Sequence, residues 1–277
     1  MKVDNVLILA AGKGTRMGEI GTIVPKVLWP IFKKSILELE IDYAKKFNPT
    51  SIYINLYNYK DKVLEFAHMR ESFQSIEFIE ERQPLDIGGA IHNLAKKLSY
   101  KGSLLILNSD QFIMLNQQKL SQLENMSKKS DATLLVYKVD PKAGYGGLEI
   151  KSNKLKSLIS KEESSKRSEL TTYTGMSIVN LESLRPCEGE SKFFESVANP
   201  QKMDISTLSI DDCLYWDFGT LSRYKKSIKS ILSSQDDFIS FLKETSSFPR
   251  IDSSDNRHIK IDEEFTLAGD ELIFKRS

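Results

Sequence analysis

The residues best suited to chemistry form a loop near the start of the chain. The stretch VLILAAGKGTRMG (Val6–Gly18) passes from an apolar run into a loop with three glycines, Lys13 and Arg16. Glycines let a backbone approach a phosphate closely and turn its N–H groups toward it. The spacing is neither that of Walker A nor that of the dinucleotide-binding fingerprint, because the third glycine comes late. Alone, the loop indicates either an anion site or a tight turn with solvent-facing charges.

Further motifs follow this loop. The stretch VPKVLWPI (Val24–Ile31) places Lys26 after a proline, so the two segments read A-A-G-x-G-T-R-M followed by P-K-x-L. This pattern resembles the sugar-1-phosphate nucleotidyltransferase family, the enzymes that make nucleotide sugars. Over Val3–Lys229 the resemblance is carried, in the expected order, by LAAGKGTRMG, PKVL, QPLDIGGAI, LILNSD, YTGMSIV and WDFGT. The compact N-acetylmuramate 1-phosphate uridylyltransferase-like members are nearest, through PLDIGG and the short core.

The resemblance implies nucleotidyl transfer: a sugar phosphate oxygen attacks the α-phosphorus of a nucleoside triphosphate in line, and pyrophosphate leaves. The acceptor is already anionic, so catalysis depends on bringing two polyanions together and neutralising the developing charge. By family position, Arg16 would grip the β- and γ-phosphates, and Lys26 would lie between the acceptor phosphate and the α-phosphate. A solvated surface position is the alternative for each. The triphosphate would be bound by Ala10, Ala11, Gly12, Lys13 and Gly14.

Two aspartates far apart in sequence are the expected metal ligands. Asp110 ends LILNSD and Asp217 lies in WDFGT. Mg²⁺ is commonly bound by one or two carboxylates together with substrate phosphates and waters, and the resemblance assigns both aspartates to Mg²⁺. The alternatives are a helix N-cap for Asp110 and a turn or cap for Asp217. Family members often have tryptophan two places before the second aspartate, whereas here Trp216 directly precedes it.

The motif QPLDIGGAI is expected to face the base. Gln83 occupies the position at which thymidylyl and uridylyl relatives use a polar side chain to read the base edge. A glutamine amide both donates and accepts, so it matches a pyrimidine imide, which favours UTP or dTTP over GTP. A solvated turn residue is the alternative. Gly88 would allow close approach of the base before the following helix.

The sequence contains only part of the family's pattern for the sugar site. Gly147 and Gly175 resemble glycines that line the acceptor pocket of the family. Relatives often carry Glu-Glu-Lys-Pro after the strand that corresponds to GLEI, and this chain has Leu-Ile-Ser-Lys there instead. Lys161, the last of these, is expected either to meet the acceptor phosphate or to lie free on the surface. No motif names the sugar.

The elements that must position these residues are strands that alternate with helices along the chain. We expect strands over Val6–Ala10, Ser51–Leu56, Ile76–Glu80 and Ser103–Asn108, and helices over Ile36–Phe47, Lys60–Met69 and Ile87–Leu98. Alternation indicates crossover units and a largely parallel sheet, whose ligands bind outside the carboxyl ends of the strands. The glycine loop and Asp110 should therefore share one rim. The expected architecture is α/β, a three-layer Rossmann-like nucleotidyltransferase fold with a mixed, mostly parallel central sheet.

The chain is expected to divide into a catalytic domain over residues 1–232 and a polar extension over residues 233–277. After residue 130 the expected strands are ATLLVYKV, GLEI, LKSLI and TYTGMSIVN, with a charged, mobile loop over Ser160–Glu169. LYWDFGT should end a strand and lead into a helix near Leu221–Leu232. In the extension, HIKI, FTL and ELIF predict a small hairpin unit around an AGDE turn.

Composition narrows the function classes. The 277 residues are 40% hydrophobic and 28% charged, as in ordinary globular proteins. A net charge of +1 suggests neither a nucleic-acid partner nor an anionic membrane surface. No apolar run approaches the roughly 20 residues that span a bilayer. Cys187 and Cys213 form neither a disulfide framework nor a zinc spacing, so we expect a cytoplasmic protein.

The leading hypothesis is a magnesium-dependent enzyme that joins a nucleoside triphosphate, with UTP favoured, to a sugar 1-phosphate. A cytidylyl- or guanylyltransferase acting on another phosphorylated acceptor is the neighbouring alternative, although PLDIGGAI and WDFGT argue against a non-sugar acceptor. The other alternative is a non-catalytic nucleotide-binding regulator on the same fold. The intact set of two cations and two aspartates argues against it. Nothing in the sequence indicates an oligomeric state.

Overall fold

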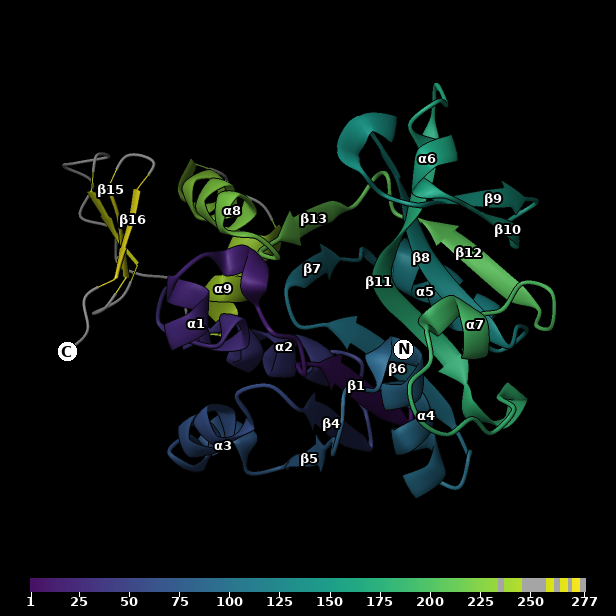
Figure 1. The fold of residues 1–277 in the computed structure, drawn as a ribbon, viewed down its shortest axis with the longest axis horizontal. Coiled ribbons are helices and arrows are strands. Elements are labelled where there is room, and N and C mark those ends of the chain that lie inside the picture. Colours follow the sequence, from purple (N-terminus) through teal and green to yellow (C-terminus); the bar gives the residue numbers. More distant parts are fainter. Residues whose placement is uncertain (234–236, 246–257, 262–264, 269–270, 275–277) are drawn as a thin grey trace.

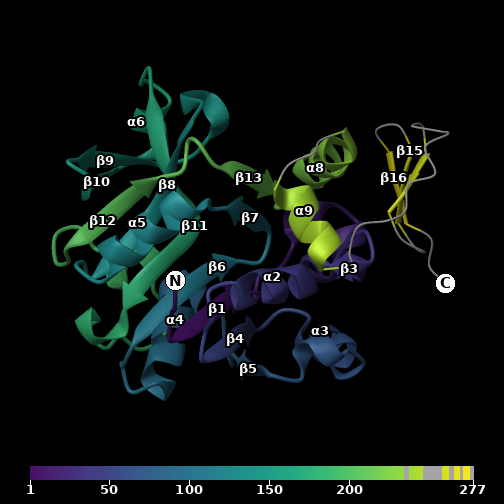
Figure 2. The ribbon, with the colours of Figure 1, turned by 180° about the vertical axis from the view of Figure 1, so that it is seen from behind.

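The fold is built on a nine-stranded sheet (Figures 1 and 2). The computed structural model describes residues 1–233, 237–245, 258–261, 265–268 and 271–274. The strand order is β5-β4-β1-β6-β11-β8-β12-β10-β9. The bounds are β1 Asn5–Leu9, β4 Ser51–Leu56, β5 Ile76–Glu80, β6 Ser103–Asn108, β8 Ala132–Val139, β9 Gly147–Lys151, β10 Lys154–Ile159, β11 Leu170–Asn180 and β12 Ile205–Ser209. Strands β11 and β10 run against the direction that the others share, so the mixed, mostly parallel sheet is confirmed.

Helices cover both faces of this sheet. Their bounds are α1 Ile20–Ile23, α2 Ile36–Lys45, α3 Lys60–His68, α4 Asp86–Lys97, α5 Gln117–Ser127, α6 Lys161–Ser164, α7 Phe193–Ser196, α8 Leu221–Ser233 and α9 Asp237–Glu244. The two opposite views place α2 and α5 on one side of the sheet and α4 and α7 on the other (Figures 1 and 2). The expected three layers are therefore present.

The burial of β1 explains why its sequence is apolar from Val6 to Leu9. Val6 and Ile8 belong to the core under α2, whereas Leu7 belongs to the second core under α4. Successive side chains of a strand point to opposite faces, so a strand covered on both sides has no solvent-facing position. Helix α2 begins at a capping box, in which Ser35 and Glu38 satisfy each other's backbone N–H groups.

Smaller sheets complete the structure. Their strands are β2 Pro30–Ile31 with β3 Lys34–Ser35, β7 Gln111–Met114 with β13 Leu214–Asp217, and β14 His258–Lys260, β15 Phe265–Ala268 and β16 Glu271–Phe274. The strands expected at HIKI, FTL and ELIF thus form a three-stranded antiparallel sheet. Gly269 and Asp270 of the expected AGDE turn lie outside the described residues. The expected strand at LYWDFGT is confirmed as β13, and the following helix as α8.

Two segments differ from expectation. The charged loop expected over Ser160–Glu169 contains α6, because a capping box between Ser160 and Glu163 stabilises one helical turn there. In the residues expected to form a polar extension, α9 buries Phe238, Phe241 and Leu242 completely in the main core. Among the described residues, no helix has the length and apolar character needed to cross a membrane.

Candidate active site

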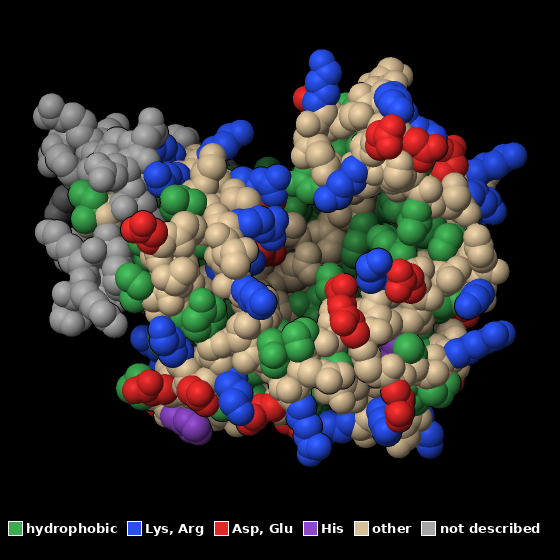
Figure 3. Space-filling view, in the orientation of Figure 1, with side chains coloured by type: hydrophobic (Ala, Val, Ile, Leu, Met, Phe, Trp, Pro, Cys, Tyr) green, Lys and Arg blue, Asp and Glu red, His purple; other side chains and the backbone are tan. Residues whose placement is uncertain are grey.

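A cavity of about 410 Å³ opens where the parallel strands β1, β4, β5 and β6 end. The surface is hollowed at its centre, and lysine and arginine side chains gather beside the hollow (Figure 3). Residues in its wall include Ala11, Gly12, Lys13, Arg16, Lys26, Asn55, Asn58, Glu81, Leu85, Asn108 and Asp110. The cavity therefore lies at the carboxyl ends of the strands, where the alternation of elements predicts ligand binding.

The glycine loop presents its backbone and two cations to this cavity. Gly14 has a φ of 65°, which a residue with a side chain adopts only at a cost. Met17 is fully buried and anchors the loop, while Lys13 and Arg16 are exposed beside the cavity. Ala10 is buried just behind the cavity wall. Main-chain groups and positive charge thus converge as an anion site requires.

Two amides at the end of β4 hold the loop in place. The Asn55 Oδ1 accepts from the backbone N–H of Ala10 at 2.8 Å, and the Asn58 Nδ2 donates to the Ala11 carbonyl at 2.8 Å. Neither asparagine belongs to a motif that the sequence alone singles out. Both lie at the carboxyl end of an expected strand, SIYINL. Once the strand order is known, this position indicates that they belong to the ligand site.

Lys26 and Asp110, assigned to different roles, form an ion pair in the structure. Lys26 begins the short 3-10 helix η2 (Lys26–Leu28), and Asp110 lies in the turn between β6 and β7. Trp29 Nε1 donates to the Val24 carbonyl at 3.1 Å, which holds the lysine segment against the core. Asp110 precedes a strand, so the alternative of a helix N-cap does not apply to it.

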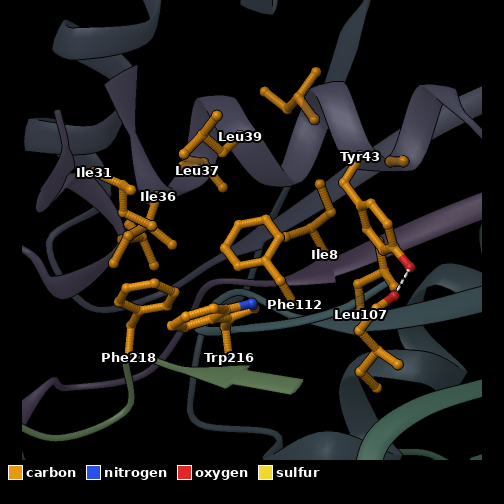
Figure 4. Packing of buried hydrophobic residues seen from close by; sticks show 14 of the residues in the cluster. Ile8, Ile31, Ile36, Leu37, Leu39, Tyr43, Leu107, Phe112, Trp216 and Phe218 are labelled. Carbon is orange, nitrogen blue, oxygen red and sulfur yellow. Dashed lines mark hydrogen bonds between the residues drawn. The ribbon is translucent and has the colours of Figure 1, made fainter. Parts of the chain in front are cut away.

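Asp217 is brought to the same place by its neighbours in sequence. Trp216 and Phe218 are buried in the core below α2 (Figure 4), so the alternation of the strand turns Asp217 to the other side. Strand β13 pairs with β7, which places Asp217 opposite Gln111. The Phe218 N–H also donates to the Asp110 carbonyl at 2.8 Å.

The two aspartate carboxylates converge on Gly219. A Cβ at this position would lie 2.9 Å from Asp110 Oδ2 and 3.0 Å from Asp217 Oδ1, so a side chain there would press on both. Burial raises the pKa of Asp217, and the nearby Asp110 adds to the rise. The Gly219 N–H at 2.7 Å and Arg223 at 2.8 Å offset part of it. The bond to Gly219 is the turn role that the sequence offered as an alternative for Asp217.

This pair has the chemistry of a divalent cation site. Two carboxylates with like charge gain from a cation between them, and the small Gly219 leaves room for one. No group of three or more His, Cys, Asp or Glu side chains able to hold a metal is found in the described part of the chain. A bound Mg²⁺ would therefore take its other ligands from substrate phosphates and water, as Mg²⁺ commonly does.

The motif expected to face the base is only partly at the cavity. Leu85, Asp86 and Ile87 line it, whereas Gln83 is exposed and is not among the lining residues that the structure describes. A Cβ on Gly88 would lie 2.6 Å from both the Ser191 carbonyl and Ser196 Oγ. Gly88 therefore allows α4 to pack closely against the segment around α7.

A buried carboxylate that no sequence motif marks lies beside this stretch. Glu81 lines the cavity and accepts a hydrogen bond from Asn55 Nδ2 at 2.7 Å. Burial raises the pKa of Glu81, and the bond from Asn55 offsets part of the rise. Asn55 thus links the glycine loop to Glu81. EERQP shows two adjacent acids, but the sequence does not show that one of them is buried.

The residues expected at the sugar site lie farther along the sheet. Gly175 has a φ of 95° at a register shift in β11, and a Cβ there would lie 2.0 Å from Asn108 Nδ2. Gly147 is buried at the start of β9, against Leu170 and Ile159. Lys161 is exposed at the start of α6. Of these, Gly175 directly contacts a residue of the cavity wall, namely Asn108.

Comparison with known proteins assigns most of the chain to a protein family. The model of a family described as nucleotidyl transferase matches residues 5–231. The bifunctional protein GlmU of Buchnera aphidicola is 33% identical over 186 residues, 66% of this chain and 39% of the relative. GlmU of Acinetobacter baylyi is 30% identical over 164 residues, 58% of this chain and 34% of the relative. The chain thus spans well under half the length of these relatives.

Solved structures share the fold. HddC from Yersinia pseudotuberculosis in complex with GMP-PN has a TM-score of 0.66 and 23% identity, covering 82% of this chain and 99% of HddC. A putative glucose-1-phosphate thymidylyltransferase from Bacillus anthracis has a TM-score of 0.68 and 18% identity, covering 84% and 96%. A UDP-glucose pyrophosphorylase with UDP-glucose has a TM-score of 0.66 and 15% identity, covering 84% and 100%.

Proposed function

Because the chain belongs to the nucleotidyl transferase family, we propose that it transfers a nucleotidyl group from a nucleoside triphosphate to a sugar 1-phosphate. The observation that carries this proposal is the meeting of Lys26, Asp110 and Asp217 at the edge of a cavity walled by the glycine loop. A protein that only binds a triphosphate needs cations and has no need of paired carboxylates. The two carboxylates beside Lys26 suit a reaction at a nearby phosphorus atom, because they can hold a divalent cation next to it.

The proposed reaction uses these groups for position and charge. An oxygen of the acceptor phosphate forms a bond to the α-phosphorus, and the bond from that phosphorus to the bridging oxygen of pyrophosphate breaks. The exposed Arg16 and Lys13 neutralise the departing pyrophosphate. Lys26 exchanges its pairing with Asp110 for the charge that develops on the α-phosphoryl oxygens. A divalent cation, proposed as Mg²⁺ on Asp110 and Asp217, supplies further positive charge when bound.

We propose UTP as the donor because the amide of Gln83, which is exposed next to the cavity-lining Pro84, matches the edge of a pyrimidine imide. The structural neighbours include HddC with GMP-PN, a UDP-glucose pyrophosphorylase with UDP-glucose and a putative thymidylyltransferase, so the shared fold accommodates several bases and does not favour one. Thermal unfolding with Mg²⁺ and each of ATP, CTP, GTP, UTP and dTTP tests the choice. A ligand at 100 times its dissociation constant stabilises the fold by about 2.7 kcal/mol. A shift with GTP alone would overturn the choice of donor.

The transfer itself is tested by pyrophosphate release across a panel of sugar 1-phosphates with each triphosphate, with the nucleotide sugar identified by mass. Asp110→Asn should lose at least about 100-fold in turnover, comparable to the loss of a charge-stabilising group. The control is Asp212→Asn, because Asp212 is an exposed partner of Lys119 at 2.9 Å. Triphosphate binding by the wild type without pyrophosphate release on any acceptor would favour a non-catalytic binding protein.

A further inference from the structure

The strands β7 and β13, beside the two aspartates, pack against a helix that lies outside the family match. Helix α9 begins at Asp237, whereas the nucleotidyl transferase model matches residues 5–231. The helix lies beside α2 in both views of the fold (Figures 1 and 2). Its Phe238 is fully buried and belongs to the main core. The family pattern therefore does not account for the place of this ring.

The Phe238 ring contacts both strands at once. Its centre lies 5.1 Å from that of Phe112 on β7 and 5.3 Å from that of Trp216 on β13. Phe112 is two residues after Asp110, and Trp216 directly precedes Asp217. Phe112 and Trp216 are also directly opposite each other in the antiparallel pairing of the two strands, so they share one face. One aromatic side chain thus packs against both strands at the aspartate pair.

Ring packing has to hold Trp216, because the polar atom of its side chain takes no part. Trp216 Nε1 is buried and has no hydrogen-bond partner within the described residues. The indole stacks on Phe238 with an angle of 25° between the ring planes. Figure 4 shows the indole beside Phe218, whose ring centre lies 6.3 Å from that of Phe238. Because protein interiors are close-packed and transmit strain, a change at Phe238 would move Trp216 and the aspartate next to it.

We propose that Phe238 is a positioning residue for the divalent cation, because it sets the separation of the Asp110 and Asp217 carboxylates. The inference rests on the proposed function and adds to it a residue from outside the family match. The two carboxylates can share a cation only while they converge on Gly219. A displacement of about 1 Å, caused far from the reacting atoms, is enough to cost about 100-fold in rate.

The test compares Phe238→Leu with Phe241→Leu. Phe241 is the matched control, because it lies on the same helix and is 1% exposed, against 0% for Phe238. Its ring centre lies 6.2 Å from that of Phe112 and 6.0 Å from that of Tyr43. Among the ring contacts of the described residues, none joins Phe241 to Trp216.

Three measurements separate a positioning role from a structural one. Mn²⁺, which takes the same oxygen ligands as Mg²⁺, is added to the protein alone, and electron paramagnetic resonance gives its dissociation constant. Thermal unfolding gives the cost of each substitution to the fold. Steady-state kinetics use the acceptor identified by the panel of sugar 1-phosphates.

Both leucine variants should lower the melting temperature by a similar amount, since each removes one buried ring. Phe238→Leu should raise the Mn²⁺ dissociation constant and lower kcat, each about tenfold, and leave the acceptor KM unchanged. Phe241→Leu should leave all three unchanged. Phe238→Met fills the space with a flexible apolar chain; it carries the same expectation and replaces the leucine variant if that variant does not fold.

An equal loss of Mn²⁺ affinity in Phe238→Leu and Phe241→Leu would show that α9 acts only through general stability, and would overturn the inference. Unchanged Mn²⁺ binding in Phe238→Leu, with a wild type that turns over, would overturn it and leave the proposed function standing. A loss of Mn²⁺ affinity confined to Phe238→Leu, in a protein that turns over no sugar 1-phosphate, would support the positioning role while the proposed function fails. A wild type that binds no Mn²⁺ would also overturn the inference, because the carboxylates would then not form a cation site.

Discussion

At the scale of single residues, the site depends on a few side chains with opposite charges held very close together. Lys26 is paired with Asp110 and Arg223 with Asp217, so in the absence of substrate each carboxylate has a cation from the protein. Removing one member of a partly buried pair leaves the other charge without compensation. Substitutions here should therefore change the charge seen by a bound phosphate.

We expect Lys26→Met to lower kcat at least about 100-fold, because the lysine is placed where charge develops during transfer. Lys34→Met is the matched control. Lys34 forms a similar ion pair with Asp42 at 2.5 Å, at the start of α2 and away from the described cavity wall. Steady-state kinetics of both variants beside the wild type give the comparison. A similar loss in Lys34→Met would indicate a general effect of losing an ion pair.

Gly219 offers a second test at this scale. A methyl group there would lie about 3 Å from both aspartate carboxylates, so we expect Gly219→Ala to push them apart and lower kcat/KM about 100-fold. Thermal unfolding without ligands should change little, while the extra stabilisation by Mg²⁺ and triphosphate should shrink. Retained activity with normal metal dependence would show that the carboxylates do not act as a pair.

At the scale of elements, each helix and strand end places one functional group while its other face joins the core. Strand β13 is an example, because Trp216 and Phe218 pack inward and turn Asp217 toward the site. In helix α2, packing one face into the core has an energetic cost. Its Glu40 is fully buried, and both carboxyl oxygens have no hydrogen-bond partner within the described structure.

Glu40 should make stability depend on pH. Burial raises the pKa of its carboxyl well above the usual 4.5, and the charge of Asp110 adds to this. The folded state then holds the proton more tightly than the unfolded state. The free energy of unfolding is therefore highest below pH 4.5 as far as Glu40 is concerned, and falls as the pH rises toward the pKa of the folded state.

We expect Glu40→Leu to remove this decline and to raise the free energy of unfolding at pH 8 by about 1–3 kcal/mol, the cost of a buried polar group without a partner. Glu65→Leu on α3 is the control, because Glu65 is exposed and such changes stay within about 0.5 kcal/mol. Urea unfolding at several pH values measures both. A destabilised Glu40→Leu at pH 8 would mean that the carboxylate has a favourable role in the core.

At the scale of the whole molecule, the last part of the chain contributes to the same core as the catalytic strands. Phe238 of α9 lies 5.1 Å from Phe112 of β7, measured between ring centres, and Phe265 of β15 lies 5.3 Å from Trp29. Phe112 and Trp29 adjoin the segments that carry Asp110 and Lys26. The end of the chain thus supports the site from behind.

A chain ending at residue 233 should therefore be strongly destabilised. Burying one phenylalanine contributes about 3–5 kcal/mol, and α9 buries two, against a typical total of about 5–15 kcal/mol. A chain ending at residue 245 keeps α9 and should lose less, mainly the contact of Phe265 with Trp29. Thermal unfolding and near-ultraviolet circular dichroism compare the two. Equal stability of both with the full chain would assign the core to residues 1–233 alone.

The order of the elements and the positions of the charged groups along the chain follow from local sequence patterns. Local patterns carry this information, because strand-like runs separated by helix-like segments mark β1, β4, β5 and β6, and the glycine loop and Asp110 follow two of these strands. The motifs occur in the order that the resembled family shows. The match of the nucleotidyl transferase family model to residues 5–231 agrees with this resemblance.

Tertiary structure decided which groups meet. Lys26 and Asp110 are 84 residues apart and Asp217 is more than 100 residues farther along, so their contact depends on strand pairing and not on local pattern. The same holds for Asn55 with the loop and for Phe238 with Trp216. The average polarity of the sequence also gave no indication of α9, in which four buried hydrophobic side chains stand among charged neighbours. Proximity across the sheet is a property of the packed chain, and only the fold supplies it.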